Sequence, residues 1–392
     1  MKIDSKVFEG LVADVMPAIQ ARTMLPILEC VHVHSEGERL VVEATNLELG
    51  IRSETEDVVI DEPIAFCVSA KRLHRILKVI DGELVIKHDG GVLSIRDGSS
   101  EFDLATLDPD DYPPLPEVID ENVVTFGDSK LQNALRAVAY AISHDEHRYI
   151  LNGVSIEFVG DHVDVVATDG RRLAHVGIES DGGEFNALDG QKLILAENAT
   201  RSIGQNQNEN LSLFCASNDV CVKSGDLTIF AKAIEGQFPN WRQVAKKADQ
   251  SVEIKMRVDD AITAIRRVSI MADDKVPNMV VRFANNECLL SARGEYSGSA
   301  SDAFACECDS GNHVFSVNPD YLADAIKSCG SEEIEISLNA NEASDSAMVF
   351  SAGNYEAVLM PMRYTAEHAR PVGETNGKVA AQIDADEEAS DE

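Results

Sequence analysis

The chain has 392 residues, of which 44% are hydrophobic, and a formal net charge of −34 at pH 7. This length allows two or three domains with packed cores, and the charge argues against general adhesion to nucleic acid but not against a local basic surface. The apolar runs are far shorter than the roughly 18 residues of a membrane span. The first residues, MKIDSKVFEG, contain no signal-peptide core, so we expect a cytoplasmic protein.

One helical pattern occurs three times along the chain. Apolar residues recur at steps of three and four in residues 5–19, 129–142 and 258–271, which predicts a helix with one apolar face in each segment. Ser129 is the predicted N-cap of the second helix. The three segments begin roughly 125 residues apart, and this repetition indicates three copies of one domain-sized unit.

A second helix and several hairpins are predicted within each unit. The second helices are expected at residues 69–81, 195–204 and 318–330, and alternating apolar and polar residues predict antiparallel strands between the helices. A strand–turn–strand sits at matching places in EATNLELGI, VATDGRRLA and LSARGEYSG. The fold class is therefore α+β: three tandem alike domains, each with two helices against antiparallel sheets.

Two connecting segments set the predicted boundaries. Residues 108–122 hold four prolines among acidic residues, and residues 235–250 separate the second and third units. We expect domains at residues 1–121, 122–248 and 249–366, followed by a disordered acidic tail at 367–392. Asp108, Asp110 and Asp111 are interpreted as a solvated turn in preference to a metal site. The eight cysteines lack CxxC spacing and are interpreted as reduced core thiols, and no metal or cofactor is expected.

The number of helices limits what such units can enclose. Six helices per chain, placed side by side at about 9 Å, would leave a hole of roughly 25 Å for two chains, under about 10 Å for one and roughly 40 Å for three. Duplex DNA is about 20 Å wide and densely anionic, so a two-chain ring fits it. The predicted helices carry cations suited to such a hole: Lys71, Arg72, Arg75, Lys78, Lys130, Arg136, Arg266, Arg267 and Lys327.

Several motifs closely resemble the bacterial DNA polymerase sliding clamps, the beta subunits of replicative polymerases. They are RTMLPIL (22–28), RYILNG (148–153), ATDGRRLA (167–174), FPNWRQV (238–244) and VLMPMR (358–363), and the resemblance spans about residues 1–364. It implies the DNA-clamp fold and a head-to-tail homodimeric ring of six alike domains. It also implies a protein that is not an enzyme, is loaded by a clamp loader, and confers processivity by tethering the replicative DNA polymerase to encircled DNA.

The resemblance also implies three sets of functional residues. The DNA-facing set is Arg22, Lys71, Arg72, His144, Arg148 and Tyr149. The set that binds apolar peptides of polymerases, the clamp loader and repair proteins is Leu151, Thr168, Gly170, Arg171, Arg172, Leu173, Pro239, Val244, Val276, Asn318, Tyr321, Val358, Met360, Pro361, Met362 and Arg363. The dimer interface is Phe102 and Leu104, on an expected edge strand, with Ile270 and Met271. The alternatives are ordinary turn packing for His144 and Tyr149, core packing for the strand end Met360-Pro361-Met362, and ordinary packing within a domain for the interface residues.

Some positions depart from the family pattern. Asp145 replaces a neutral polar residue, and Glu197-Asn198 stands where basic residues are common, so both weaken the expected DNA contact of the second domain. Gln243 stands where the family often has arginine, and Val276 stands where a larger residue can occur, so both bear on which partner peptides this chain prefers. The tail beyond Met362-Arg363 either solubilises the protein or competes with DNA or partners for basic surfaces.

An enzyme is disfavoured because the sequence contains no P-loop, GxGxxG or GxSxG motif. His144 and His147 have no further ligand cluster and make a weak metal site. The rival from another class is a scaffold that binds partner peptides without encircling DNA.

Overall fold

The structure is a computed structural model that describes residues 1–20, 23–98, 100–118, 122–180, 185–216, 218–245, 251–294, 298–308, 311–339 and 346–362. It divides into two compact units. The first comprises Met1–Val165 and Ile178–Phe238, and the second comprises Val166–Gly177 and the chain from Pro239 onward. Within the described residues, every helix is too short or too polar to cross a membrane.

A thirteen-stranded antiparallel sheet runs through the first unit in the order β10-β15-β16-β17-β4-β3-β2-β6-β9-β8-β7-β1-β5. Its strands are β1 (Lys2–Asp4), β2 (Cys30–Glu36), β3 (Arg39–Thr45), β4 (Leu49–Thr55), β5 (Val58–Val59), β6 (Ala65–Ser69), β7 (Glu83–Asp89), β8 (Val92–Asp97), β9 (Ser100–Leu107), β10 (Val123–Phe126), β15 (Leu211–Ala216), β16 (Asp219–Ser224) and β17 (Leu227–Lys232). β11 (Gly153–Val159) pairs with β14 (Lys192–Ala196) in the same unit.

The sheet of the second unit has the order β13-β25-β24-β23-β18-β21-β20-β19-β22. These strands are β13 (Arg172–Glu179), β18 (Ser251–Arg257), β19 (Met279–Ala284), β20 (Glu287–Gly294), β21 (Gly298–Cys308), β22 (His313–Val317), β23 (Glu333–Asn339), β24 (Met348–Ala352) and β25 (Tyr355–Leu359). β12 (His162–Thr168) precedes β13 and leads into this unit through a short turn. The last strand, β25, therefore pairs with a strand that lies roughly 180 residues earlier in the chain.

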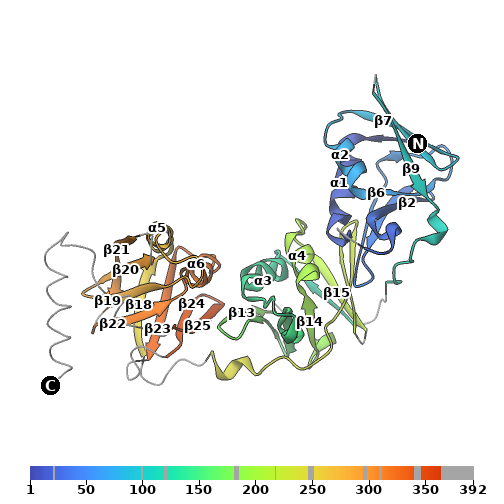
Figure 1. The fold of residues 1–392 in the computed structure, drawn as a ribbon. Coiled ribbons are helices and arrows are strands. Elements are labelled where there is room, and N and C mark those ends of the chain that lie inside the picture. The colour runs from blue at the N-terminus through green and yellow to red at the C-terminus, as the bar shows by residue number, and fades with distance from the viewer. Residues whose placement is uncertain are drawn as a thin grey trace, which may run out of the picture. The chain divides into compact units, whose positions relative to one another are not determined.

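Within the described residues, six α-helices pack in three pairs against these sheets (Figure 1). The pairs are α1 (Ser5–Val15) with α2 (Ala70–Leu77), α3 (Lys130–Val138) with α4 (Glu197–Gln205), and α5 (Val258–Ser269) with α6 (Pro319–Lys327). The apolar residues that recur at three- and four-residue steps are the buried ones, as Leu131, Leu135 and Val138 show in α3. Each helix therefore turns one apolar stripe to the core and a polar face outward.

The predicted helices and the α+β class with three clamp domains are confirmed. Ser129 is the N-cap residue of α3, as predicted, and its carbonyl accepts from the Asn133 N–H at 2.9 Å, but its backbone is left-handed (φ 53°) and its side chain makes no capping hydrogen bond. The strand that carries Phe102 and Leu104, β9, is not an edge strand along its whole length, because Cys67 and Val68 of β6 pair with its end. Residues 100–105 of β9 pair with β8 on one side. The domain boundaries stay a prediction, and the acidic tail lies outside the described residues.

The two units contain the same kind of strand junction. In the first unit β17 pairs with β4, with Phe230 opposite Gly50, and in the second β25 pairs with β13, with Val358 opposite Leu173. The turn before each of β4 and β13 is closed by a threonine whose hydroxyl donates to a carbonyl four residues on: Thr45 at 3.2 Å and Thr168 at 2.7 Å. The duplication predicted from the sequence thus extends to individual hydrogen bonds.

Candidate functional site

The turn between β12 and β13 is held in one conformation by its own side chains. The Thr168 hydroxyl accepts from the Gly170 N–H at 3.1 Å, and Asp169 Oδ1 accepts from the N–H groups of Arg171 and Arg172 at 2.8 and 3.0 Å. Gly170 has φ of +84°, a conformation that residues with a Cβ rarely adopt. The turn therefore presents Arg171 and Arg172 from a rigid frame.

Arg172 joins this turn to helix α6. Its Nε lies 3.1 Å from Asp169 Oδ2 and its Nη1 lies 2.7 Å from Asp324 Oδ2. The guanidinium carbon also lies 4.1 Å from the centre of the Tyr321 ring. Because the fork of an arginine can contact two carboxylates and an aromatic face together, Arg172 fixes Tyr321 beside the turn.

The start of α6 is fixed from the other side by its N-cap. Asn318 Oδ1 accepts from the N–H groups of Asp320 and Tyr321 at 2.9 and 3.2 Å, which satisfies two donors of the first helical turn. Tyr321 is therefore held by its backbone as well as by Arg172. Two of the predicted peptide-binding residues, Asn318 and Tyr321, thus have defined positions next to a third, Arg172.

The end of β25 adds an apolar edge to the same unit. Leu173 and Val358 are buried opposite each other, while Met360 is 42% exposed just beyond the strand. The Met360 N–H donates to the Arg171 carbonyl at 2.9 Å, and the Met362 N–H donates to the Ser316 carbonyl at 2.6 Å. Hydrogen bonds thus hold the backbone of an exposed methionine, a side chain that adapts to varied apolar ligands.

Two further predicted pocket residues of this unit are exposed apolar side chains. Val244 is 49% and Val276 is 60% exposed, and Pro239 is also exposed. Exposed apolar side chains such as these suit the binding of an apolar peptide. Of the sixteen predicted pocket residues, Leu151 belongs to the first unit and Arg363 lies outside the described residues, while the rest belong to the second unit.

Sequence reasoning missed three residues that support this site. Asp169 and Asp324 anchor Arg172, and the ring of the buried Trp241 packs at a tilt against that of His175, with centroids 4.4 Å apart. Trp241 stood inside the quoted FPNWRQV motif, so its burial had a sequence signal. Asp324 had none, because it lies 152 residues from Arg172.

The predicted DNA-facing residues differ in their surroundings. On α2, Lys71 and Arg72 are exposed together with Arg75 and Lys78 on the polar face of the helix. Such a row of cations could contact phosphates without reading bases. Arg22 lies outside the described residues.

In the second repeat, acids stand directly beside the predicted cations. His144 Nδ1 lies 3.3 Å from Glu197 Oε2, and Arg148 Nε lies 3.7 Å from Asp145 Oδ2. Tyr149 is exposed next to them. The two acids are the departures noted in the sequence, and they lower the local positive potential at His144 and Arg148.

The predicted interface residues lie at two places. Leu104 is buried and Phe102 is half-buried on β9 of the first unit. Ile270, directly after α5 in the second unit, is 75% exposed, and Met271 is half-buried. An apolar side chain as exposed as Ile270 suits a contact with another chain.

One group of the described residues has donors suited to a metal. The donor atoms of His32, His34 and Glu43 lie within 4.8 Å of one another. Arg52 Nη1 lies 3.5 Å from Glu43 Oε1, and His34 Nε2 lies 3.1 Å from Glu36 Oε1. The cationic guanidinium opposes a metal ion here, and the group is a polar network across β2, β3 and β4.

The eight cysteines, all within the described residues, form no disulfide, and most are buried. Burial raises the pKa of Cys67 and of Cys215 to about 12, and that of Cys306 to about 11. A thiol with so high a pKa is a poor nucleophile at neutral pH. These cysteines therefore behave as small apolar core residues.

Comparison with known proteins places the whole described chain in one family. Sequence models of the DNA polymerase III beta subunit match in order: the N-terminal domain over residues 1–116, the central domain over 125–240 and the C-terminal domain over 246–363. The beta sliding clamp of Pseudomonas aeruginosa is 26% identical over 354 residues, which cover 88% of this chain and 94% of that protein. That of Staphylococcus epidermidis is 27% identical over 338 residues, covering 82% and 88%.

Solved structures agree in fold. The chain is similar to the sliding clamp of Bartonella birtlesii bound to griselimycin, with a TM-score of 0.84, 26% identity and coverage of 93% of this chain and 99% of that one. The beta subunit of DNA polymerase III from Thermotoga maritima has a TM-score of 0.83 at 19% identity, with the same coverage.

Proposed function

Because this chain belongs to the DNA polymerase III beta subunit family, the bacterial sliding clamps, we propose that two copies close into a ring around duplex DNA. The ring tethers the replicative polymerase and confers processivity. The observation that carries the proposal is the ordered match of three family domains to a chain whose helices form three alike pairs. The chain itself catalyses no reaction, needs no cofactor and acts in the cytoplasm.

Weak contact with phosphates suits a ring that must slide. The exposed cations Lys71 and Arg72 of α2 supply sequence-independent contacts, whose affinity falls steeply with salt. The acids beside His144 and Arg148 weaken the contact made by the second domain. An overall charge of −34 keeps the protein from adhering to DNA outside its hole.

Partner proteins dock on the site around Arg172. The rigid turn, Tyr321 and the exposed Met360 supply a fixed polar edge and an adaptable apolar one. Polymerases, the clamp loader and repair proteins insert short apolar peptides there. The family resemblance adds Leu151 and Arg363 to the residues proposed to bind these peptides.

Two chains join head to tail through residues 100–105 of β9 on one and the end of α5 on the other. The side of β9 away from β8 offers backbone groups for strand pairing, and Ile270 offers exposed apolar surface. In this proposed interface, Phe102 and Leu104 of one chain and Met271 of the other pack beside Ile270.

The proposal is tested by comparing how long the loaded protein stays on closed circular DNA and on linear DNA. Loaded protein should stay on a closed circle through gel filtration and leave within minutes once the circle is cut, because a ring held by topology runs off free ends. Equal retention on circular and linear DNA would refute encirclement. It would favour the scaffold that binds partner peptides without enclosing DNA.

A further inference from the structure

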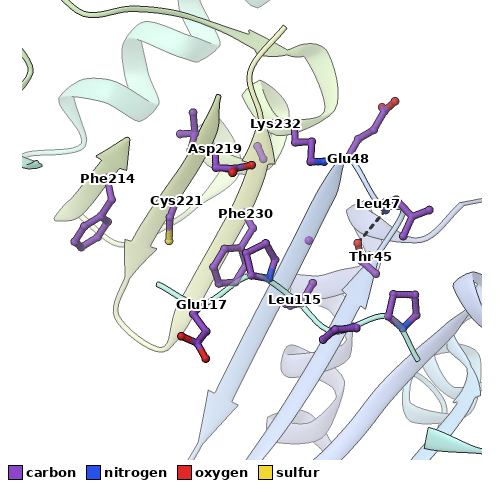
Figure 2. Close-up of a pocket in the computed structure, with 16 residues that line it drawn as sticks. Thr45, Leu47, Glu48, Leu115, Glu117, Phe214, Asp219, Cys221, Phe230 and Lys232 are labelled. Atoms are coloured by element: carbon purple, nitrogen blue, oxygen red, sulfur yellow. Dashed lines mark hydrogen bonds between the residues drawn. The ribbon is translucent and has the colours of Figure 1, made fainter. Parts of the chain in front are cut away.

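A hollow of about 240 Å³ lies in the first unit beside the junction of β4 and β17 (Figure 2). Its floor is formed by Phe214, Cys221 and Phe230, and its walls include Leu47 and Leu115. Small-molecule sites usually measure about 300–1,000 Å³, so this hollow has room for one or two side chains.

A strand position that lacks a side chain lies beside the hollow. Gly50 lies opposite Phe230, at the place that Leu173 takes opposite Val358 in the other unit. Leu115, from the connecting segment, packs over Gly50; a Cβ there would come within 2.5 Å of Leu115 Cδ2. Leu115 fills only part of the space beside the buried cluster of Phe214, Cys221 and Phe230.

The backbone around the hollow is conformationally restricted. Pro113, Pro114 and Pro116 flank Leu115 and restrict its backbone. The Lys232 N–H donates to the Glu48 carbonyl at 3.0 Å, as the Met360 N–H does to Arg171 in the second unit. A preformed hollow loses little conformational entropy when a ligand enters.

The rim of the hollow is acidic. Glu48, Glu117 and Asp219 are exposed around it, with Lys232 as the basic residue among its lining. Basic groups on a ligand would therefore be attracted, and acidic ones repelled. The chain's own acidic tail, which ends EEASDE, has the wrong charge for this rim.

We propose that this hollow is a second peptide-docking site, which takes one large apolar side chain flanked by lysine or arginine. The inference rests on the proposed function in one respect: the junction that forms the hollow repeats the junction at which partner peptides are proposed to dock. Each chain then offers two sites of different character. The arginine at the first site is balanced by the carboxylates of Asp169 and Asp324, whereas the site around Gly50 has an acidic edge.

Two labelled peptides test the proposal by fluorescence anisotropy with the full-length protein. The KLFK peptide, with fluorescein on an N-terminal glycine spacer and a C-terminal amide, should bind, and the ELFE peptide labelled in the same way should bind roughly threefold to tenfold more weakly, since each exposed charge pair contributes little. The E117K/D219K double variant should reverse this order. Both positions are exposed, so the fold tolerates the change.

Variants at the two junctions separate the sites. Leu47→Asn removes an apolar wall at a residue with φ of 75°, which asparagine tolerates, and should weaken KLFK binding about tenfold. Met360→Asp, in the other unit, should leave KLFK binding unchanged.

Three results would overturn the second site: absence of KLFK binding, loss of KLFK binding in Met360→Asp but not in Leu47→Asn, or equal affinity for both peptides. None of these outcomes depends on whether the protein encircles DNA. The retention of loaded protein on closed circles is measured separately, so a failure of the ring proposal is recognised by itself.

Discussion

Replacing Arg172 with alanine should destabilise the second unit more than any exposed substitution. Arg172 contacts Asp169, Asp324 and the ring of Tyr321, and its side chain is 12% exposed. The substitution leaves two carboxylates without this partner and removes the cation from the aromatic face. The turn and α6 lose the residue that joins them.

The size of the loss follows from the burial of each partner. Asp169 is mostly buried, so its hydrogen bond to a charged group is worth about 1.5–3 kcal/mol. The ring contact adds about 0.5–1 kcal/mol. Asp324 is 44% exposed, so solvent screens that pair to about 0.2–1 kcal/mol. Together these contacts predict a loss of about 2–5 kcal/mol, less if the contacts are coupled.

Trp241 makes the assay specific. It is the single tryptophan of the chain, it lies in the second unit and it is buried against His175. Urea unfolding followed by its fluorescence therefore reports on this unit. With a slope near 2 kcal/mol per M, a loss of about 2–5 kcal/mol lowers the midpoint by about 1–2.5 M.

Arg172→Lys is the matched control. It keeps the charge but loses the planar fork, so its midpoint should lie between those of the wild type and Arg172→Ala. A midpoint within about 0.2 M of the wild type for Arg172→Ala would refute the reasoning, since the contacts would then contribute less than about 0.5 kcal/mol.

Four further predictions concern the other surfaces. Glu197→Gln removes the acid beside His144 and should lengthen the half-life on circular DNA up to about fivefold at fixed salt, measured by gel filtration; no change would mean that this face does not contact DNA. Met360→Asp should abolish binding of polymerase-derived peptides in calorimetry while the protein still sediments as a dimer. Ile270→Asp should shift sedimentation from dimer to monomer, and an unchanged dimer would place the interface elsewhere. Burial raises the pKa of Cys67 from its ordinary 9.0 to about 12, so the unfolded chain releases this proton at a lower pH than the folded chain does. The contribution of the thiol to stability is therefore complete below pH 9 and falls by up to about 1.4 kcal/mol per pH unit between pH 9 and 12. Cys67→Val should reduce this slope in urea titrations.

The helices and the threefold repeat were predictable because their signals are local. A residue such as Leu135 is buried with Leu131 and Val138 of its own helix, so the three- and four-residue spacing is written in consecutive sequence. The motifs around Gly170 and Pro361 similarly pointed to family membership. Even the acids beside the predicted DNA-facing residues were visible as departures from the pattern.

Other features depend on which distant strands and helices meet. The left-handed backbone of Ser129 and the pairing of the end of β9 with β6 were not predicted, because backbone conformation and strand order depend on tertiary packing. Asp324 reaches Arg172 only when α6 packs beside a turn 152 residues earlier, and no local pattern encodes that distance. The hollow beside Gly50 needs the same explanation: its lining forms only once Phe230 lies opposite this glycine and Leu115 packs over it. Local periodicity decides which elements form, while the register between distant elements decides which side chains become a site.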